Sequence, residues 1–184
     1  MSDQFGDEEM ANVMRDELAA RQIDYVLDFP ISSVAAGTVQ TADSKYLKYD
    51  LLMLVPPFEG NSAVKGTGLT NEDGYILVDS RMRVHNVERM YAVGDCVAFS
   101  GPKMGHMAVR QGEVAADNII AEIEGQLPTE EYDHEISFVL SEGGSDSIYF
   151  HKNVWTGDDT VIHHGRFWNW AKRVQESYWE AMHS

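Results

Sequence analysis

The sequence contains very little cysteine, since Cys96 is the only one among 184 residues. This excludes a disulfide framework and a two-cysteine redox pair within the chain, and it fits a reducing cytoplasm. Long apolar runs are lacking too, because none reaches the roughly 18 residues that a membrane-spanning helix requires. The acidic opening MSDQFGDEEM is not expected to act as a secretory signal or as a basic transit peptide.

Positive charge is also scarce. The 14 lysines and arginines face 30 aspartates and glutamates, which gives a formal net charge of −16. A chain this acidic repels phosphates, so nucleic acid is excluded as a partner. The other proportions, 43% hydrophobic and 24% charged residues, are typical of a globular protein with a sizeable core.

The third absence is a glycine-rich dinucleotide fingerprint, since no G-x-G-x-x-G follows a predicted strand. Periodicity still predicts an α/β fold, with half of it absent. The run YDLLMLV over 49–55 is the strongest strand signal, because continuous apolar residues suit a strand buried on both faces. The other predicted elements are a helix over 10–21, a strand over 25–27, a hairpin of 31–34 and 38–41 closed near Gly37, strands 75–78 and 90–93, a helix over 104–123, strands 135–140 and 147–151 joined by a turn at Gly143 and Gly144, and a helix over 166–182.

The step from strand 90–93 into Gly94 and Asp95 is the motif that carries chemistry. Residues just beyond the carboxyl ends of parallel strands face the ligand crevice. Glycine lets the backbone approach a cofactor closely, and an aspartate there can accept hydrogen bonds from sugar or ribityl hydroxyls. A bare Gly-Asp pair is most often only a turn, so the surrounding residues have to decide between the two interpretations.

Three spaced motifs supply that context: YDLLMLVPPFEG, GYILVD and VERMYAVGDCVAFSGPKMGHMAVRQGEVAADNI. In this order they resemble FAD-dependent pyridine nucleotide-disulfide oxidoreductases. The likeness is greatest to sulfide:quinone oxidoreductases and their relatives, the flavocytochrome c sulfide dehydrogenase flavoprotein and type II NADH dehydrogenases. It is strong over residues 49–125. It implies the C-terminal part of a two-Rossmann-like-domain FAD/NAD(P)-binding flavoprotein, ending in a small β-hairpin plus helix.

The resemblance also implies three parts. Residues 1–44 would be the tail of the second nucleotide-binding-like domain, 45–126 the C-terminal part of the FAD-binding domain, and 127–184 the C-terminal strands and amphipathic helix. In that family the adenosine-binding unit precedes this sequence. We therefore expect a C-terminal portion that is inactive alone and that does not hold FAD tightly alone.

The resemblance assigns residues to the flavin. Asp95 would bind the ribityl hydroxyls, with Gly94 allowing the close approach. Gly105, His106 and Met107 would lie at the N-terminus of a helix beside the flavin ring. Free backbone N–H groups and the positive end of the helix dipole stabilise an anionic reduced flavin.

Lys103 and His106 are the predicted catalytic residues, and the resemblance implies that Lys103 adds positive charge near flavin and quinone. The competing interpretations are a solvated surface lysine for Lys103 and a helix-capping residue for His106. Cys96, directly after Gly-Asp, is favoured as a small structural thiol over a redox group. No metal site is predicted, because His163 and His164 are adjacent and do not share a helix face.

One departure from the family pattern bears on the electron donor. Sulfide:quinone oxidoreductases use cysteines to take up sulfide, and Ser137 stands about where one of these cysteines is expected. Serine cannot form a polysulfide, so cysteine-based sulfide oxidation is in doubt. Ser137 favours a type II NADH dehydrogenase-like enzyme, whereas the segment GPKMGHMAVRQG favours the sulfide branch.

The predicted C-terminal helix is amphipathic, aromatic and edged by the cations Arg166, Lys172 and Arg173. Such a helix can lie in a membrane interface, or it can pack on another part of the protein. The leading hypothesis is an enzyme passing electrons from sulfide or NAD(P)H through FAD to quinone. It would be cytoplasmic, or peripheral on the inner face of the cell membrane. Its partners would be a missing N-terminal half or a second subunit, with a membrane surface as a further candidate. The rival from another class is a non-catalytic assembly or dimerisation module.

Overall fold

The computed structural model describes residues 7–141, 144–157 and 160–183. Its described residues divide into two compact units, one formed by residues 12–58 and the other by those of 7–11 and 59–183. The domain boundaries predicted at 44/45 and 126/127 stay a prediction.

The first unit holds most of helix α2 (Glu8–Ala20) and a small antiparallel sheet of three strands, β1 (Ile31–Ala35), β2 (Thr38–Thr41) and β3 (Tyr46–Lys48). The predicted hairpin is confirmed, with Val34 opposite Val39. Gly37 closes it with φ of 75°, a left-handed conformation that glycine adopts without strain. Strand β3 was not predicted.

Two strands expected in this unit, 25–27 and 49–55, do not form in the described part of the chain. A strand exists only when a neighbour pairs with its backbone, and no described segment pairs with these. The apolar side chains of the second segment are accordingly exposed, with Leu51 at 91% and Met53 at 90%. The apolar run over 49–55 therefore does not lead to burial within the described residues, because no neighbouring strand is present.

The second unit is built around helix α3 (Gly105–Ile123), the helix expected over 104–123. Its buried face repeats at helical spacing and includes Met107, Gln111, Val114 and Asn118. The predicted strands 75–78 and 90–93 pair only through single bridges, such as Ile76 with Val97 and Arg83 with Tyr91. The core contains Val78, Met82, Val84, Ala92, Val97, Val114, Ala115 and Tyr132.

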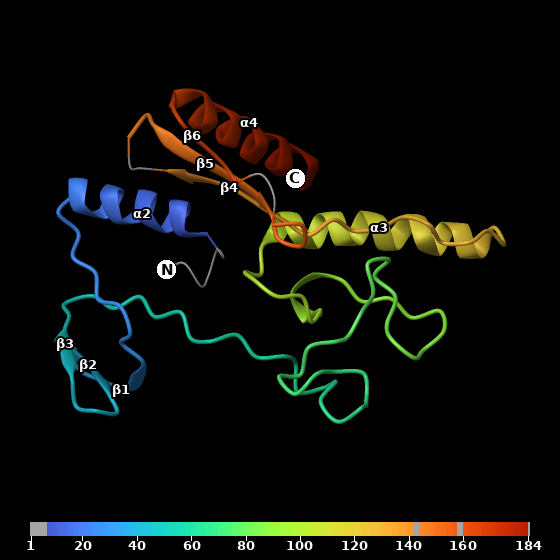
Figure 1. The fold of residues 1–184 in the computed structure, drawn as a ribbon, viewed down its shortest axis with the longest axis horizontal. Coiled ribbons are helices and arrows are strands. Elements are labelled where there is room, and N and C mark those ends of the chain that lie inside the picture. The colour runs from blue at the N-terminus through green and yellow to red at the C-terminus, as the bar shows by residue number, and fades with distance from the viewer. Residues whose placement is uncertain (1–6, 142–143, 158–159, 184) are drawn as a thin grey trace. The chain divides into compact units, whose positions relative to one another are not determined.

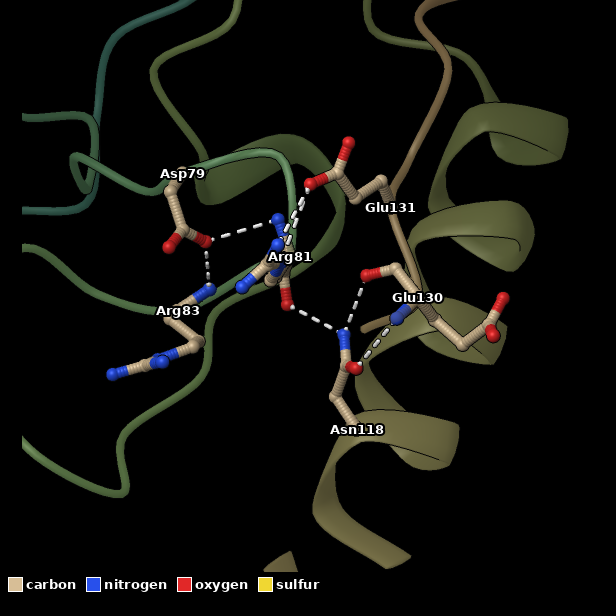
Figure 2. A network of polar contacts seen from close by, with 6 residues as sticks. All are labelled: Asp79, Arg81, Arg83, Asn118, Glu130 and Glu131. Carbon is tan, nitrogen blue, oxygen red and sulfur yellow. Dashed lines mark hydrogen bonds and ion pairs between the residues drawn. The ribbon is translucent and has the colours of Figure 1, made fainter. Parts of the chain in front are cut away.

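Asn118 fastens this helix to two other segments of the same unit (Figure 2). Its side-chain amide donates to the carbonyl oxygens of Arg81, at 3.2 Å, and Glu130, at 2.8 Å, and its oxygen accepts the Glu130 N–H at 3.0 Å. The amide nitrogen and the oxygen of Asn118 thus both have hydrogen-bond partners, although the side chain is fully buried. Leaving these groups unpaired would cost about 1 to 3 kcal/mol each, so Asn118 fixes how α3 lies on the core.

The C-terminal part of this unit is a three-stranded antiparallel sheet with a helix beside it (Figure 1). Strands β4 (Glu135–Ser141) and β5 (Ser147–Asn153) confirm the predicted hairpin, and β6 (Val161–His164) adds a strand that was not predicted. Gly143 of the predicted turn lies outside the described residues. Helix α4 (Arg166–His183) matches its prediction. Among the described residues, no helix is long and apolar enough to cross a membrane.

Candidate functional site

The Gly94–Asp95 step forms a tight turn at the start of the short 3-10 helix η1 (Gly94–Cys96). Gly94 has φ of 78°, which a residue with a side chain adopts only under strain. Its N–H donates to the side-chain oxygen of Gln111 on α3 at 2.6 Å. The turn is therefore tied to the helix that follows it, and the carboxylate of Asp95 stays available to a ligand.

Helix α3 begins beside this turn, and the side chain of its cap residue does not hydrogen-bond the first N–H groups of the helix. Met104 has the extended conformation of a cap residue, but its side chain accepts no hydrogen bond from the helix. The N–H groups of Gly105, His106 and Met107 begin the helix. A free N–H row at the positive end of the dipole favours an anionic or strongly accepting ligand.

A small cavity joins the turn to the helix start. It is lined by Gly94, Asp95, Val97, Phe99, Pro102, Lys103, Met104, Met107, Ala108, Gln111 and His134. Four residues singled out by sequence thus come together here: Gly94, Asp95, Lys103 and Met107. Gly105 and His106 line a second and larger groove on the other side of the helix start.

Lys103 is half-buried, and its ammonium group is already engaged by the chain. It donates to the carbonyl oxygens of Val97 at 2.5 Å and Phe99 at 3.2 Å, and it lies 4.6 Å from the ring centre of Tyr75. Burial lowers its pKa, although the negative charge of Asp95 acts in the opposite direction. Lys103 therefore closes the loop before α3 and places a cation at the cavity wall.

His106 bonds to the strand opposite its helix and not to the helix end. Its Nε2 accepts the N–H of Ser137 at 3.3 Å and lies 3.3 Å from the carbonyl oxygen of Glu135. Ser137, the residue expected near a redox cysteine position, thus lies directly beside the start of α3. Its hydroxyl is 3.5 Å from that of Tyr149 on the next strand.

Cys96 is half-buried, and its thiol donates to the carbonyl oxygen of Val93 at 3.2 Å. It is not among the residues that line the cavity. A hydrogen bond within its own turn is consistent with a structural role for Cys96.

Sequence reasoning missed His134, which lines the cavity, and Tyr132, whose hydroxyl hydrogen-bonds to it. Both are buried, at 3% and 1% exposure. The His134 ring lies 2.7 Å through Nε2 from the Ser100 carbonyl oxygen and 3.1 Å through Nδ1 from the Tyr132 hydroxyl. No local motif marks them, because they enter the site from a segment beyond α3.

Comparison with known proteins gives the family of this chain. Residues 1–112 match the profile of the pyridine nucleotide-disulphide oxidoreductase family. Ferroptosis suppressor protein 1 of Xenopus laevis is 29% identical over 109 residues, or 58% of this chain. Dihydrolipoyl dehydrogenase of Haloferax volcanii is 34% identical over 92 residues, or 48% of this chain. The chain spans 29% and 19% of the lengths of these two relatives.

Solved structures share the fold. The sulfide:quinone oxidoreductase of Aquifex aeolicus superposes with a TM-score of 0.79 at 18% identity, covering 91% of this chain and 43% of that one. LpdA of Mycobacterium tuberculosis gives a TM-score of 0.56 at 14% identity, covering 89% of this chain and 44% of that one.

The fold is that of a class of proteins, the two-domain FAD/NAD(P)-binding oxidoreductases. Within that class the chain belongs to the pyridine nucleotide-disulphide oxidoreductase family. FAD is the cofactor of this family, so the expected fold class and the expected cofactor are both confirmed.

Proposed function

We propose that this chain is part of an FAD-dependent oxidoreductase of the sulfide:quinone oxidoreductase-like group, which passes electrons from sulfide or NAD(P)H through flavin to quinone. The proposal rests on one observation: a cavity and a groove both lie at the N-terminus of α3. The cavity beside Asp95 lies on one side of the start of α3, and the groove beside His106 lies on the other.

The residues around the cavity fit the sugar-alcohol part of a flavin. The left-handed turn at Gly94 leaves no side chain on the approach, and Asp95 offers two acceptor oxygens to ribityl hydroxyls. The N-terminus of α3 would receive the electron-rich edge of the ring. When bound, FAD supplies the two-electron chemistry, while these residues hold and orient it.

The groove suits an aromatic, apolar acceptor such as a quinone. It has a volume of about 990 Å³ and lies between α3, β4, β5 and α4. This is the upper end of the range of small-molecule pockets, about 300 to 1,000 Å³. Its lining includes the aromatic residues Phe138, Tyr149, Trp168 and Trp179. His106 and Ser137 add polar groups that can hydrogen-bond a quinone oxygen.

Ser137 bears on the electron donor. It stands beside His106 at the groove, where a cysteine could have taken up sulfide, and its hydroxyl cannot form a persulfide. Cys96 is outside the cavity lining and bonds to its own turn. These observations favour NAD(P)H as donor, in a type II NADH dehydrogenase-like enzyme, over cysteine-based sulfide oxidation.

The proposed partners include other protein and a membrane surface. Leu51, Met53 and Phe58 are 66% or more exposed, which supports a second half or a second subunit covering this segment. The same exposure is the observation that favours the alternative of a non-catalytic assembly module. The exposed aromatic residues of α4 support a peripheral position on the inner face of the cell membrane, with the body of the protein in the cytoplasm.

The first experiment titrates the purified chain into riboflavin and into FAD and follows quenching of the flavin fluorescence. We expect both flavins to bind the isolated chain weakly, and Asp95→Ala to weaken both further by about tenfold or more, because each ribityl hydrogen bond to a carboxylate contributes about 1.5 to 3 kcal/mol. The control is Asp117→Ala, which removes an exposed carboxylate on the far part of α3. Equal binding by the two variants would contradict the assigned role of Asp95.

A second experiment separates the donors. The chain, combined with the second half or second subunit proposed above and loaded with FAD, is mixed without oxygen with NADH, NADPH or sulfide in separate cuvettes, and the visible absorbance band of oxidised flavin is followed. We expect NADH or NADPH to bleach the band and a water-soluble quinone to restore it. Bleaching by sulfide alone would overturn the preference for NAD(P)H. A bleached band that quinone does not restore would overturn the proposed acceptor.

A further inference from the structure

A second groove lies along α4, on the opposite face of the helix from the groove beside His106. It has a volume of about 700 Å³ and lies between the first half of α4 and the connection that precedes β5. No residue of α4 lines both grooves, because the two sets of lining residues fall about half a turn apart around the helix. We call the second one the arginine groove. Its lining residues are Gly144, Ser145, Arg166, Asn169, Trp170, Arg173, Val174 and Ser177.

The charge of the arginine groove is opposite to that of the whole chain. The chain has 30 acidic and 14 basic residues, yet both charged side chains in the lining are arginines. The glutamates of α4, Glu176 and Glu180, line the groove beside His106 instead. Residues 166–175 carry three cations and no acid. The arginine groove therefore favours an anion as its ligand.

Both guanidinium groups are accessible to a ligand. Within the described residues Arg166 makes its contacts through Nε, which donates to the Ser145 hydroxyl at 3.1 Å and lies 3.7 Å from a carboxylate oxygen of Asp146. This ion pair is exposed at both ends, so a stronger anion can displace the carboxylate at little cost. Arg173 is exposed and forms no hydrogen bond or ion pair with the part of the chain that the structure describes. The planar fork of NH2 groups on each arginine matches two oxygens of a phosphate.

The rest of the lining suits a ligand with a charged head and an apolar body. The hydroxyls of Ser145 and Ser177 can donate to phosphate oxygens. Trp170 lies between the two arginines along the helix and is 61% exposed, and Val174 is 48% exposed. A free phosphate offers nothing to these apolar side chains, whereas a phospholipid presents a phosphate next to hydrocarbon.

We propose that the arginine groove binds the phosphate headgroups of anionic phospholipid, with Arg166 and Arg173 on the phosphates and Trp170 in the adjoining hydrocarbon. The inference rests on the proposed membrane position and deepens it, because it names the lipid and the residues that bind it. The groove beside His106 then lies one helix diameter, about 10 to 12 Å, from the lipid surface. A quinone dissolves in hydrocarbon, so this position brings the proposed acceptor close to its groove.

The net charge of −16 does not prevent this contact. An anionic surface repels an acidic protein over long distances, but at physiological ionic strength salt screens this repulsion beyond about 8 Å. The contacts of Arg166 and Arg173 with phosphates act at shorter range. Each basic residue close to an anionic surface strengthens binding about fivefold, so the two arginines together outweigh the screened repulsion.

Co-sedimentation of the chain with two kinds of vesicle tests the inference, one of phosphatidylcholine alone and one of equal parts of phosphatidylcholine and phosphatidylglycerol. At about 0.15 M salt we expect tighter binding to the anionic vesicles. Arg166→Gln with Arg173→Gln should weaken that binding by about tenfold or more. The matched control is Lys45→Gln with Lys48→Gln, which removes the same charge from two exposed lysines. An equal loss in both double variants, or equal binding of the wild type to both vesicles, would overturn the site.

Two further measurements identify the source of the phosphate and the role of the guanidinium forks. NMR of the arginine Nε–H groups should show Arg166 and Arg173 shifting with dissolved dihexanoyl phosphatidylglycerol and not with inorganic phosphate at the same concentration. Equal shifts with inorganic phosphate would identify a free-anion site and overturn the lipid assignment. Arg166→Lys with Arg173→Lys keeps the charge but loses the forks, so it should bind the anionic vesicles less tightly than the wild type. Unchanged binding would overturn the phosphate contact of the forks.

Failure of this inference and failure of the proposed flavin chemistry are distinguishable. Neither arginine lines the cavity beside Asp95, so Arg166→Gln with Arg173→Gln should bind riboflavin as the wild type does. A wild-type chain that binds flavin but neither kind of vesicle would overturn the arginine groove and the membrane position alone. A wild-type chain that binds no flavin would contradict the proposed function, while the comparison of vesicles would still decide the arginine groove.

Discussion

At the scale of single residues, two buried polar side chains of α3 are paired with partners far along the chain. Asn118 joins α3 to the backbone of Arg81 and Glu130 (Figure 2), and Gln111 on the same helix accepts from Gly94. A hydrogen-bonded side chain inside a core adds little net energy, but its removal leaves the partner unpaired. These two residues therefore restrict where α3 can lie on the core.

Asp7 gives a prediction at this scale. Its carboxylate accepts hydrogen bonds from the Met10 N–H at 2.8 Å, the Lys152 ammonium at 2.9 Å and the Thr160 hydroxyl at 2.6 Å. Burial by itself raises the pKa of Asp7, but the bonds from Thr160, Met10 and Lys152 together lower it from 3.8 to about 2. The charged form is therefore favoured in the folded chain.

We expect Asp7→Asn to reduce the free energy of unfolding at neutral pH by about 1 to 2 kcal/mol. In the wild type this contribution is present above pH 3.8 and is lost as the pH falls through about 2, because the lowered pKa belongs to the folded state. Denaturant unfolding at several pH values measures both. Asp16→Asn, an exposed change on the same helix, serves as the control. Equal stability of the two variants would contradict the role of Asp7.

At the scale of elements, α4 has two different apolar faces. Trp168 stacks on Tyr149 at a ring distance of 4.1 Å and holds the helix on the sheet. Phe167, Trp170 and Tyr178 are each 58% exposed or more. Aromatic residues in this state, with Arg166 and Arg173 nearby, are suited to the boundary between lipid and water.

We expect the chain to co-sediment with phospholipid vesicles, and the double change Phe167→Ser with Trp170→Ser to weaken this binding by about tenfold or more. The matched control is Ile123→Ser with Leu127→Ser, which removes two side chains that are 80% and 84% exposed elsewhere. Circular dichroism checks that α4 remains helical. An equal loss in both double variants would show that the binding has no preference for α4.

Comparing the observed helices and strands with the predicted ones shows which of them sequence patterns can predict. All three described helices lie within a few residues of their predicted ranges, because a helix makes its hydrogen bonds within one segment. The strands predicted at 25–27 and 49–55 did not form, because each needs a neighbour that no described segment provides. The hairpin at Gly37 was predicted correctly because its two strands are separated by only two residues, Ala36 and Gly37.

At the scale of the whole molecule, the chain consists of two units joined through the segment before Glu59. Residues 50–60 form no regular element, and several of their apolar side chains are exposed. Proteases need an extended, accessible segment, and they cut most readily where the chain is not held by hydrogen bonds.

We therefore expect chymotrypsin, in a brief digestion, to cut first after Leu51, Met53 or Phe58, which mass spectrometry of the fragments will identify. Changing Leu51, Met53 and Phe58 to glycine should slow this first cut and leave later ones unaffected. First cuts within α3 or within strands β4 and β5 would contradict the division into two units.

The sequence by itself determined the family, the cofactor, the helices and the Gly94–Asp95 turn, since each is carried by residues that are close along the chain. Only the tertiary structure decided which residues hold that turn in place and what lies beside it. Gln111 binds the Gly94 N–H and His134 contacts the Ser100 carbonyl oxygen through hydrogen bonds between separate segments. The groove at His106 and Ser137 exists because β4 passes the start of α3. Contacts of this kind depend on how segments pack, which no local pattern encodes.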